Sequence, residues 1–81
     1  MEGEARVTGE DIFVQRCGNI YLVSDDVTLM YGFGDTIEEA RADYEESVRE
    51  LITILEHSPN PLDKPTLIAV RCHAKAHQIL D

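Results

Sequence analysis

Cysteine and long apolar runs are both scarce in this sequence. Its two cysteines, Cys17 and Cys72, are too few for the dense framework of a disulfide-stapled secreted protein, although one bridge between them stays open. Without a secretory signal we expect free, mostly buried thiols in a cytoplasm. A membrane span needs about eighteen apolar residues in a row, and no run approaches that length, so we expect a soluble chain without membrane contact.

Basic residues are also few, which argues against nucleic acid as a partner. Seven lysines and arginines stand against sixteen aspartates and glutamates, for a formal net charge of -9. A field of this sign repels phosphate groups, so we do not expect nucleic-acid binding. The imbalance belongs to residues 1–63, with fifteen acids and four bases, whereas residues 64–81 hold three bases and one acid.

The chain is short, which limits the number of domains and the size of the core. With 81 residues and no internal repeat, it should form a single domain over 1–81, with a core over 12–56 and a C-terminal element over 64–80. A core of this size is marginally stable alone. We therefore expect a homodimer, a higher oligomer or a permanent partner.

A long amphipathic helix is the strongest secondary-structure signal in the chain. Thr36 is a favourable N-cap, and Glu39 three residues later completes a capping box, so the helix should begin after Thr36. Pro59 and Pro61 should end it near residues 56–58. Apolar residues recur at three- and four-residue spacing and define a stripe for burial. They are Ile37, Ala40, Tyr44, Val48, Leu51, Ile52 and Leu55.

The opposite face of this helix is charged and mostly acidic. Arg41 and Glu45, and Glu45 and Arg49, are four residues apart and able to pair weakly. Two interpretations stay open, a solvated face or an acidic surface presented to a basic partner. On the second interpretation, the partner-binding residues are Glu38, Asp43, Glu45, Glu46 and Glu50.

Three strands are predicted before this helix. Apolar and β-branched runs at 12–14 and 20–23 flank a Gly-Asn pair at 18–19 that tolerates positive φ, a pattern typical of an antiparallel hairpin. A third strand is expected at 27–31, followed by the Gly32–Gly34 segment as a tight turn into the helix. The helix should cover the apolar face of this three-stranded antiparallel sheet, which predicts the α+β class.

The C-terminal element at 64–80 fits two structures. Asp63 is a plausible N-cap and Pro65 suits a first helical turn, so we prefer a second helix. The β-branched content of residues 66–73 leaves a fourth strand as the alternative. Apolar residues fit two helical stripes, Leu67, Val70 and Ala74 on one and Cys72, Ala76 and Ile79 on the other.

His73 and His77 have the spacing of a metal-binding helix. They would share a face, because they are four residues apart. A cationic, solvated last turn at the negative end of a helix dipole explains the pair more simply. We therefore expect no metal there.

Carboxylates near a strand break form a second candidate metal site. Asp25 and Asp26 could bind a divalent ion with help from Asp11 or Asp35. Turn aspartates, however, commonly accept hydrogen bonds from their own backbone. We expect no metal or other cofactor here, and we find no catalytic motif in the chain.

The passage IYLVSDDVTLMYGFGDTIEEARADYEESVREL, residues 20–51, resembles the core of the HicB-like antitoxin family. The shared features are strand, break, strand and glycine, followed by a helix entry at Gly34, Asp35, Thr36, Glu38, Glu39 and Ala40. The likeness covers about residues 12–56, and residues 57–81 carry no obvious DNA-binding tail, so the chain is similar to a stand-alone domain. The resemblance implies a partial RNase H-like fold without nuclease activity, which masks a small basic ribonuclease toxin and often assembles into dimers or larger oligomers.

Residues and resemblance together predict a non-catalytic protein-interaction module. It is expected to act like an antitoxin, using its acidic helix face to mask a small basic partner such as an mRNA-cleaving toxin. One alternative is a homo-oligomeric domain of unknown role. The other is a divalent-metal protein built on the aspartate or histidine groups.

Overall fold

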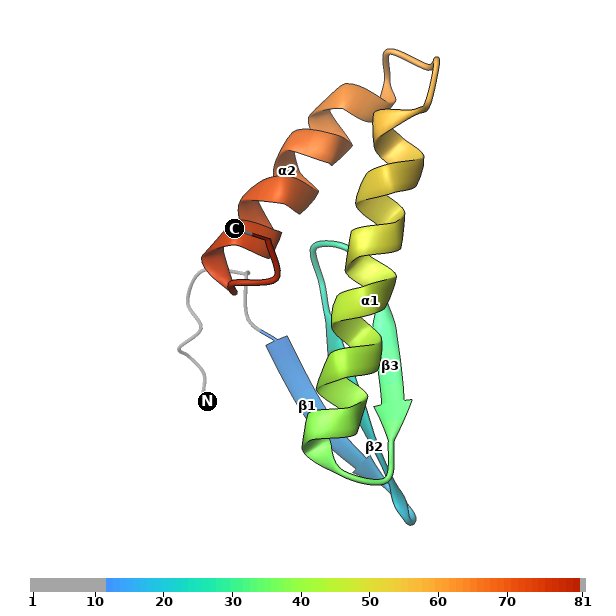
Figure 1. Ribbon diagram of the computed structural model, residues 1–81, viewed down its shortest axis with the longest axis vertical. Helices are drawn as coiled ribbons and strands as arrows, with labels where there is room; N and C mark the ends of the chain where they lie inside the picture. Colours follow the sequence, from blue (N-terminus) through green and yellow to red (C-terminus); the bar gives the residue numbers. More distant parts are fainter. Residues whose placement is uncertain (1–11, 81) are drawn as a thin grey trace.

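The fold is a three-stranded sheet with a long helix across one face. The computed structural model describes residues 12–80, and the elements are β1 (Ile12–Cys17), β2 (Ile20–Asp25), β3 (Tyr31–Gly34), α1 (Ile37–Glu56) and α2 (Asp63–Ala76). The sheet is antiparallel with the order β1-β2-β3, and α1 packs against β2, β3 and α2 (Figure 1). The predicted α+β class and second helix are confirmed, whereas the fourth-strand alternative is wrong.

Local hydrogen bonds cap both ends of α1, and the N-cap at Thr36 is the one that the sequence predicts. Thr36 Oγ1 accepts a hydrogen bond from Glu39 N at 3.1 Å. Glu39 Oε1 accepts from Asp35 N at 3.0 Å, whereas the predicted capping box places this bond one residue later, on the N–H of Thr36. At the other end, His57 N donates to the carbonyl of Thr53 at 3.3 Å. The donors and acceptors left by the helix ends are thus partly satisfied within the same stretch of chain.

The Thr36→Ala substitution should lower the free energy of unfolding by about 1 kcal/mol, because it removes the side-chain acceptor for Glu39 N. Thr53→Ala is the matched control. Thr53 is an exposed residue inside α1, and alanine is the better helix former, so stability should stay equal or rise slightly. Urea denaturation followed by circular dichroism measures both. Equal losses in the two variants would contradict a cap at Thr36.

The buried stripe of α1 supplies half of the hydrophobic core. Ala40, Tyr44, Val48 and Ile52 are buried, and Leu51 and Leu55 pack partly buried beside them. The other buried apolar residues are Val23, Val70, Ala74 and Ile79. Ile37 departs from the prediction and is 48% exposed, because it lies in the first turn of α1 at the end of the sheet.

The hairpin forms as predicted, but the third strand is displaced. β1 and β2 pair from Ile12 opposite Asp25 to Cys17 opposite Ile20, and Gly18 has a φ of 65° in the turn. The expected strand at 27–31 is wrong, since residues 26–30 form a loop and β3 begins at Tyr31. The cause is a set of hydrogen bonds from this loop to the Asp25 side chain, described below.

Gly32 and Gly34 belong to β3 and do not form the predicted turn. Gly32 pairs with Val23 and Gly34 with Tyr21, on the face of the sheet that α1 covers. A Cβ on Gly32 would lie 2.2 Å from Tyr44 N. Glycine is therefore required because the backbone of α1 lies directly on the backbone of β3.

α2 differs from its prediction in its cap and in one of its faces. The N-cap is Leu62 without a side-chain hydrogen bond, and Asp63 accepts instead from Ser58 Oγ at 2.5 Å. Pro65 lies in the first turn as expected. Leu67 is half-buried and Val70 is buried on the side toward α1, so the first stripe is confirmed.

The second predicted stripe of α2 is wrong, because α2 packs on one side only. Cys72 and Ala76 are exposed, and Ile79 is buried only beyond the end of the helix. Cys17, at the end of β1, is exposed as well. Both thiols are free, but the expectation that they are buried is wrong.

Two arginines of α1 hold the turn that follows α2. Arg41 Nη2 donates to the carbonyl of His77 at 3.2 Å, and Arg49 Nε donates to the carbonyl of Ile79 at 3.4 Å. Cations near the carbonyl end of a helix are favourable.

Within residues 12–80, no helix combines the length and the apolar character needed to cross a bilayer.

Candidate functional site

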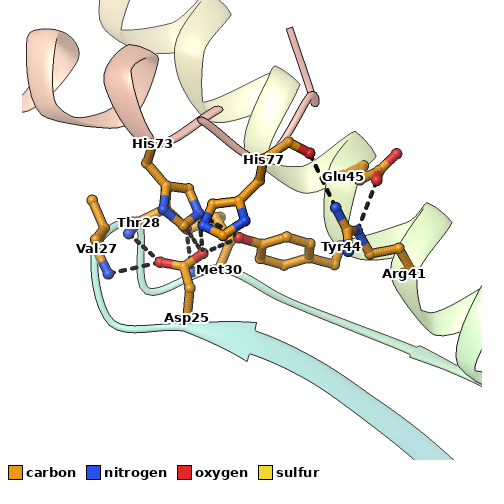
Figure 2. A network of polar contacts seen from close by, with 9 residues as sticks. All are labelled: Asp25, Val27, Thr28, Met30, Arg41, Tyr44, Glu45, His73 and His77. Atoms are coloured by element: carbon orange, nitrogen blue, oxygen red, sulfur yellow. Dashed lines mark hydrogen bonds and ion pairs between the residues drawn. The ribbon is translucent and has the colours of Figure 1, made fainter. Parts of the chain in front are cut away.

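A buried polar network joins the sheet to both helices. Asp25 ends β2, Tyr44 lies in the middle of α1 and His73 lies in α2, and Figure 2 shows the three side chains converging. Tyr44 and His73 are fully buried, and Asp25 is 5% exposed. Polar groups at this depth are stable only when they are hydrogen-bonded to one another.

The Asp25 carboxylate accepts hydrogen bonds from both the 26–30 loop and the Tyr44 hydroxyl. Its Oδ1 accepts from Val27 N at 2.7 Å and from Thr28 N at 2.5 Å. Its Oδ2 accepts from Thr28 Oγ1 at 2.7 Å and from the Tyr44 hydroxyl. The Thr28 hydroxyl accepts from Met30 N at 3.0 Å, so the carboxylate also orders the loop that leads into β3.

The connectivity determines where the protons lie. The Tyr44 hydroxyl has one proton and donates it to Asp25. His73 Nε2 lies 2.7 Å from the same hydroxyl oxygen and 3.4 Å from Asp25 Oδ2. His73 Nε2 must therefore carry a proton and donate it to the Tyr44 oxygen. The ring of His77 lies beside that of His73, with centroids 4.6 Å apart.

Burial and hydrogen bonding act in opposite directions on the Asp25 carboxyl. Burial raises its pKa, but the bonds from Tyr44, Thr28 and Val27 together outweigh burial, and the pKa falls below its ordinary value of 3.8. Burial, followed by the bond to Asp25, raises the pKa of Tyr44 far above its usual range. The network therefore holds a carboxylate and a neutral phenol at neutral pH.

This arrangement fastens three elements together, and its side chains are buried. Two hollows lie elsewhere on the surface, one lined by Tyr21 and residues 35–38, the other by residues of the 55–67 segment. Neither hollow includes a member of the network. Because the Tyr44 and His73 side chains are out of contact with solvent, the network's chemical role in this conformation is to orient α2 and the 26–30 loop.

The structure separates the aspartates of the candidate carboxylate metal site. Asp25 is committed to the network, Asp26 is exposed, and Asp35 follows β3 at the opposite end of the sheet. Asp11 lies outside the described residues. Among residues 12–80, no group of three or more histidine, cysteine, aspartate or glutamate side chains is placed to hold a metal ion.

The predicted histidine face exists, but its surroundings are different. His73 and His77 do share a side of the α2 end, as the ring contact shows. The expectation of a solvated pair is wrong for His73, which is fully buried. It follows Val70 by three residues, so the side of α2 that packs on α1 carries it to Tyr44.

The five predicted partner-binding acids fall into two groups. Asp43 Oδ2 accepts from Phe33 N at 3.0 Å, and Glu45 pairs with Arg41 at 2.8 Å and Arg49 at 3.5 Å. The other three are exposed, and within the described chain their carboxylates form no ion pair. They are Glu38, Glu46 and Glu50.

Sequence reasoning misses the network because each member has a simpler explanation. Tyr44 fits the buried stripe of α1, but its hydroxyl needs a partner when buried. Asp25 lies within the polar break at 24–26, and His73 lies three residues after Val70. These features are the available signals, although none of them indicates that the three side chains meet.

The chain was also compared with known proteins. No protein-family model, curated protein or solved structure matches it. The resemblance of residues 12–56 to HicB-like antitoxins therefore stays a prediction from the sequence.

Proposed function

We propose that this chain is a non-catalytic protein-interaction module whose α1 outer face binds a basic protein. The proposal follows the HicB-like resemblance, in which such a domain masks a small basic ribonuclease toxin. The observation that carries it is the pair Glu46 and Glu50, four residues apart and opposite the buried stripe of α1. Their carboxylates are exposed, and no described cation neutralises them.

The charge distribution supports a basic partner. Glu45 is held between two arginines and Glu56 pairs with Arg71, so these acids are locally balanced. Within residues 12–80, Glu46 and Glu50 belong to the unpaired acids of the same helix, together with Glu38. Complementary charge accelerates association and selects among partners, and its effect weakens as salt rises.

The double substitution Glu46→Lys and Glu50→Lys should weaken partner binding by roughly tenfold or more, because it replaces two attractions with repulsions. A tagged full-length chain is used to recover bound proteins from its host lysate at moderate salt, and mass spectrometry identifies them. We expect a small basic protein that is released at high salt and is lost in the double variant.

The control is Asp26→Lys with Asp35→Lys. It makes the same change in net charge, at two exposed residues outside α1. Binding should survive in this control. The proposal fails if the wild type recovers only itself, or if both double variants lose the partner equally.

A second candidate function is a homo-oligomeric domain, either alone or together with partner binding. The observation that favours it is a row of exposed aromatic and aliphatic side chains on the sheet, among them Tyr31 and Phe33. The eight buried apolar residues within 12–80 form a small core, and self-association would add to it.

A further inference from the structure

The sheet has a second face that no described element covers. The pairing of Phe13 with Ser24, and of Leu22 with Phe33, places these residues on the side away from α1. Val23 and Gly32, which pair with each other, lie on the covered side. We name the uncovered side the open sheet face. It consists of Phe13, Gln15, Cys17, Ile20, Leu22, Ser24, Tyr31 and Phe33.

The open sheet face is unusually apolar for a surface in water. Antiparallel sheets with one covered face normally turn polar residues toward solvent. Here Tyr31 is 55% exposed, Phe33 48% and Phe13 41%. The Tyr31 and Phe33 rings form a tilted pair with centroids 5.4 Å apart. Contiguous apolar surface of this kind marks an interaction site.

The face is also uncharged, in a chain with a net charge of -9. A basic protein would find no carboxylate on it, so such a partner would favour the outer face of α1. Two copies of the chain repel each other in most orientations. When they meet through their open sheet faces, the residues of those faces bring no charge to the contact.

We propose that the open sheet face binds a second copy of this chain, with the two sheets packed face to face about a two-fold axis. Such a pairing is self-complementary, because each subunit presents the same aromatic cluster to the other. This assignment rests on the proposed self-association and names the surface that produces it. The acidic outer face of α1 lies on the other side of the sheet and stays available in the dimer.

The size of the face sets the strength of the dimer. Strands about 4.8 Å apart, with residues about 3.4 Å apart, give a three-stranded face of roughly 15 by 20 Å. This corresponds to a few hundred Å² per subunit, below the roughly 800 Å² per partner of a standard interface. We therefore expect a dissociation constant in the micromolar range or weaker, and a dimer that tightens as salt screens the repulsion between the acidic chains.

Sedimentation equilibrium of the full chain over a wide concentration range tests the proposal. The wild type should dimerise, and Phe33→Asp should raise the dissociation constant by roughly tenfold or more, since two carboxylates would meet at the interface. Ile54→Asp is the matched control. It makes the same charge change at a residue that is 66% exposed on α1, and it should leave the dimer intact.

Each alternative outcome has a distinct meaning. A wild type that stays monomeric at all concentrations overturns both self-association and the surface. A dimer that Phe33→Asp leaves unchanged, or that Ile54→Asp weakens equally, overturns the surface and keeps self-association. Circular dichroism checks the fold of each variant. If Phe33→Asp unfolds, Tyr31→Asp at the more exposed neighbouring position takes its place under the same criteria.

Discussion

Replacing Gly32 with alanine should lower the free energy of unfolding by at least about 3 kcal/mol, the upper end of the usual cost of overpacking. The added Cβ would lie 2.2 Å from Tyr44 N and 2.6 Å from Ala40 O. Both contacts are main-chain atoms of α1, so no rotamer change relieves them. The helix would have to move away from the sheet, and the contacts of buried Val23 and Tyr44 would loosen with it.

Gly18→Ala is the matched control for this prediction. Gly18 has a φ of 65°, but a Cβ added there would meet no atom within 4 Å beyond its chain neighbours. Its cost should be about 1 kcal/mol, which is the strain of a left-handed alanine. Urea denaturation of both variants gives the comparison. A Gly32→Ala loss no larger than that of Gly18→Ala would contradict direct backbone contact between α1 and β3.

Local interactions explain why α1 was predictable. Its N-cap, its capping box and the prolines that follow it all act within a few residues of the helix ends. Thr36 and Glu39 form the expected bond, and the helix ends at Glu56. The hairpin at Gly18 also depends on residues that are close together in the sequence. These elements form largely as the sequence alone indicates.

The third strand was predicted, but its position could not be, because tertiary contacts override the strand propensity of residues 27–30. The segment 27–31 is rich in residues that favour strands. Asp25 nevertheless accepts from the backbone of Val27 and Thr28, and Leu29 takes a φ of 62°. Tyr44 and His73 complete the surroundings of the same carboxylate from two other elements.

The candidate site also has a part that local sequence predicts and a part that depends on tertiary contacts. The acidic outer face of α1 was predictable, because helical spacing alone places Glu46 and Glu50 away from the core. Which acids are already paired depends on where Phe33 and the arginines lie. The burial of His73 depends on the docking of α2, which has no signature in the sequence of α2 itself.

Asp25→Asn should lower the free energy of unfolding by about 3–5 kcal/mol, the usual cost of breaking a buried charged network. The carboxylate accepts from Val27 N, Thr28 N, Thr28 Oγ1 and the Tyr44 hydroxyl. An asparagine amide has one oxygen, so its NH₂ group would face donors on one side. The loop at 26–30 and the Tyr44 hydroxyl would lose their common carboxylate acceptor, and His73 would lose the carboxylate charge 3.4 Å from its Nε2.

Asp26→Asn is the control at the adjacent position. Asp26 is exposed, and the same chemical change there should alter stability by less than about 0.5 kcal/mol. Urea denaturation at neutral pH compares the two variants. If Asp25→Asn is no more destabilising than Asp26→Asn, the carboxylate does not hold the three elements together.

The pH dependence of the same pair of proteins tests the charge on Asp25 directly. Because its pKa in the folded chain lies below the ordinary 3.8, the unfolded chain binds the proton first as the pH falls. The stabilisation should be complete above about pH 5 and should be lost as the pH falls below about 4, through the folded-state pKa. The stability difference between wild type and Asp25→Asn should therefore shrink as the pH falls below about 4, while the exposed carboxylates titrate in both proteins and cancel. A difference that stays constant into strong acid would mean that Asp25 is already protonated in the folded chain, and that its hydrogen bonds stabilise the fold without its charge.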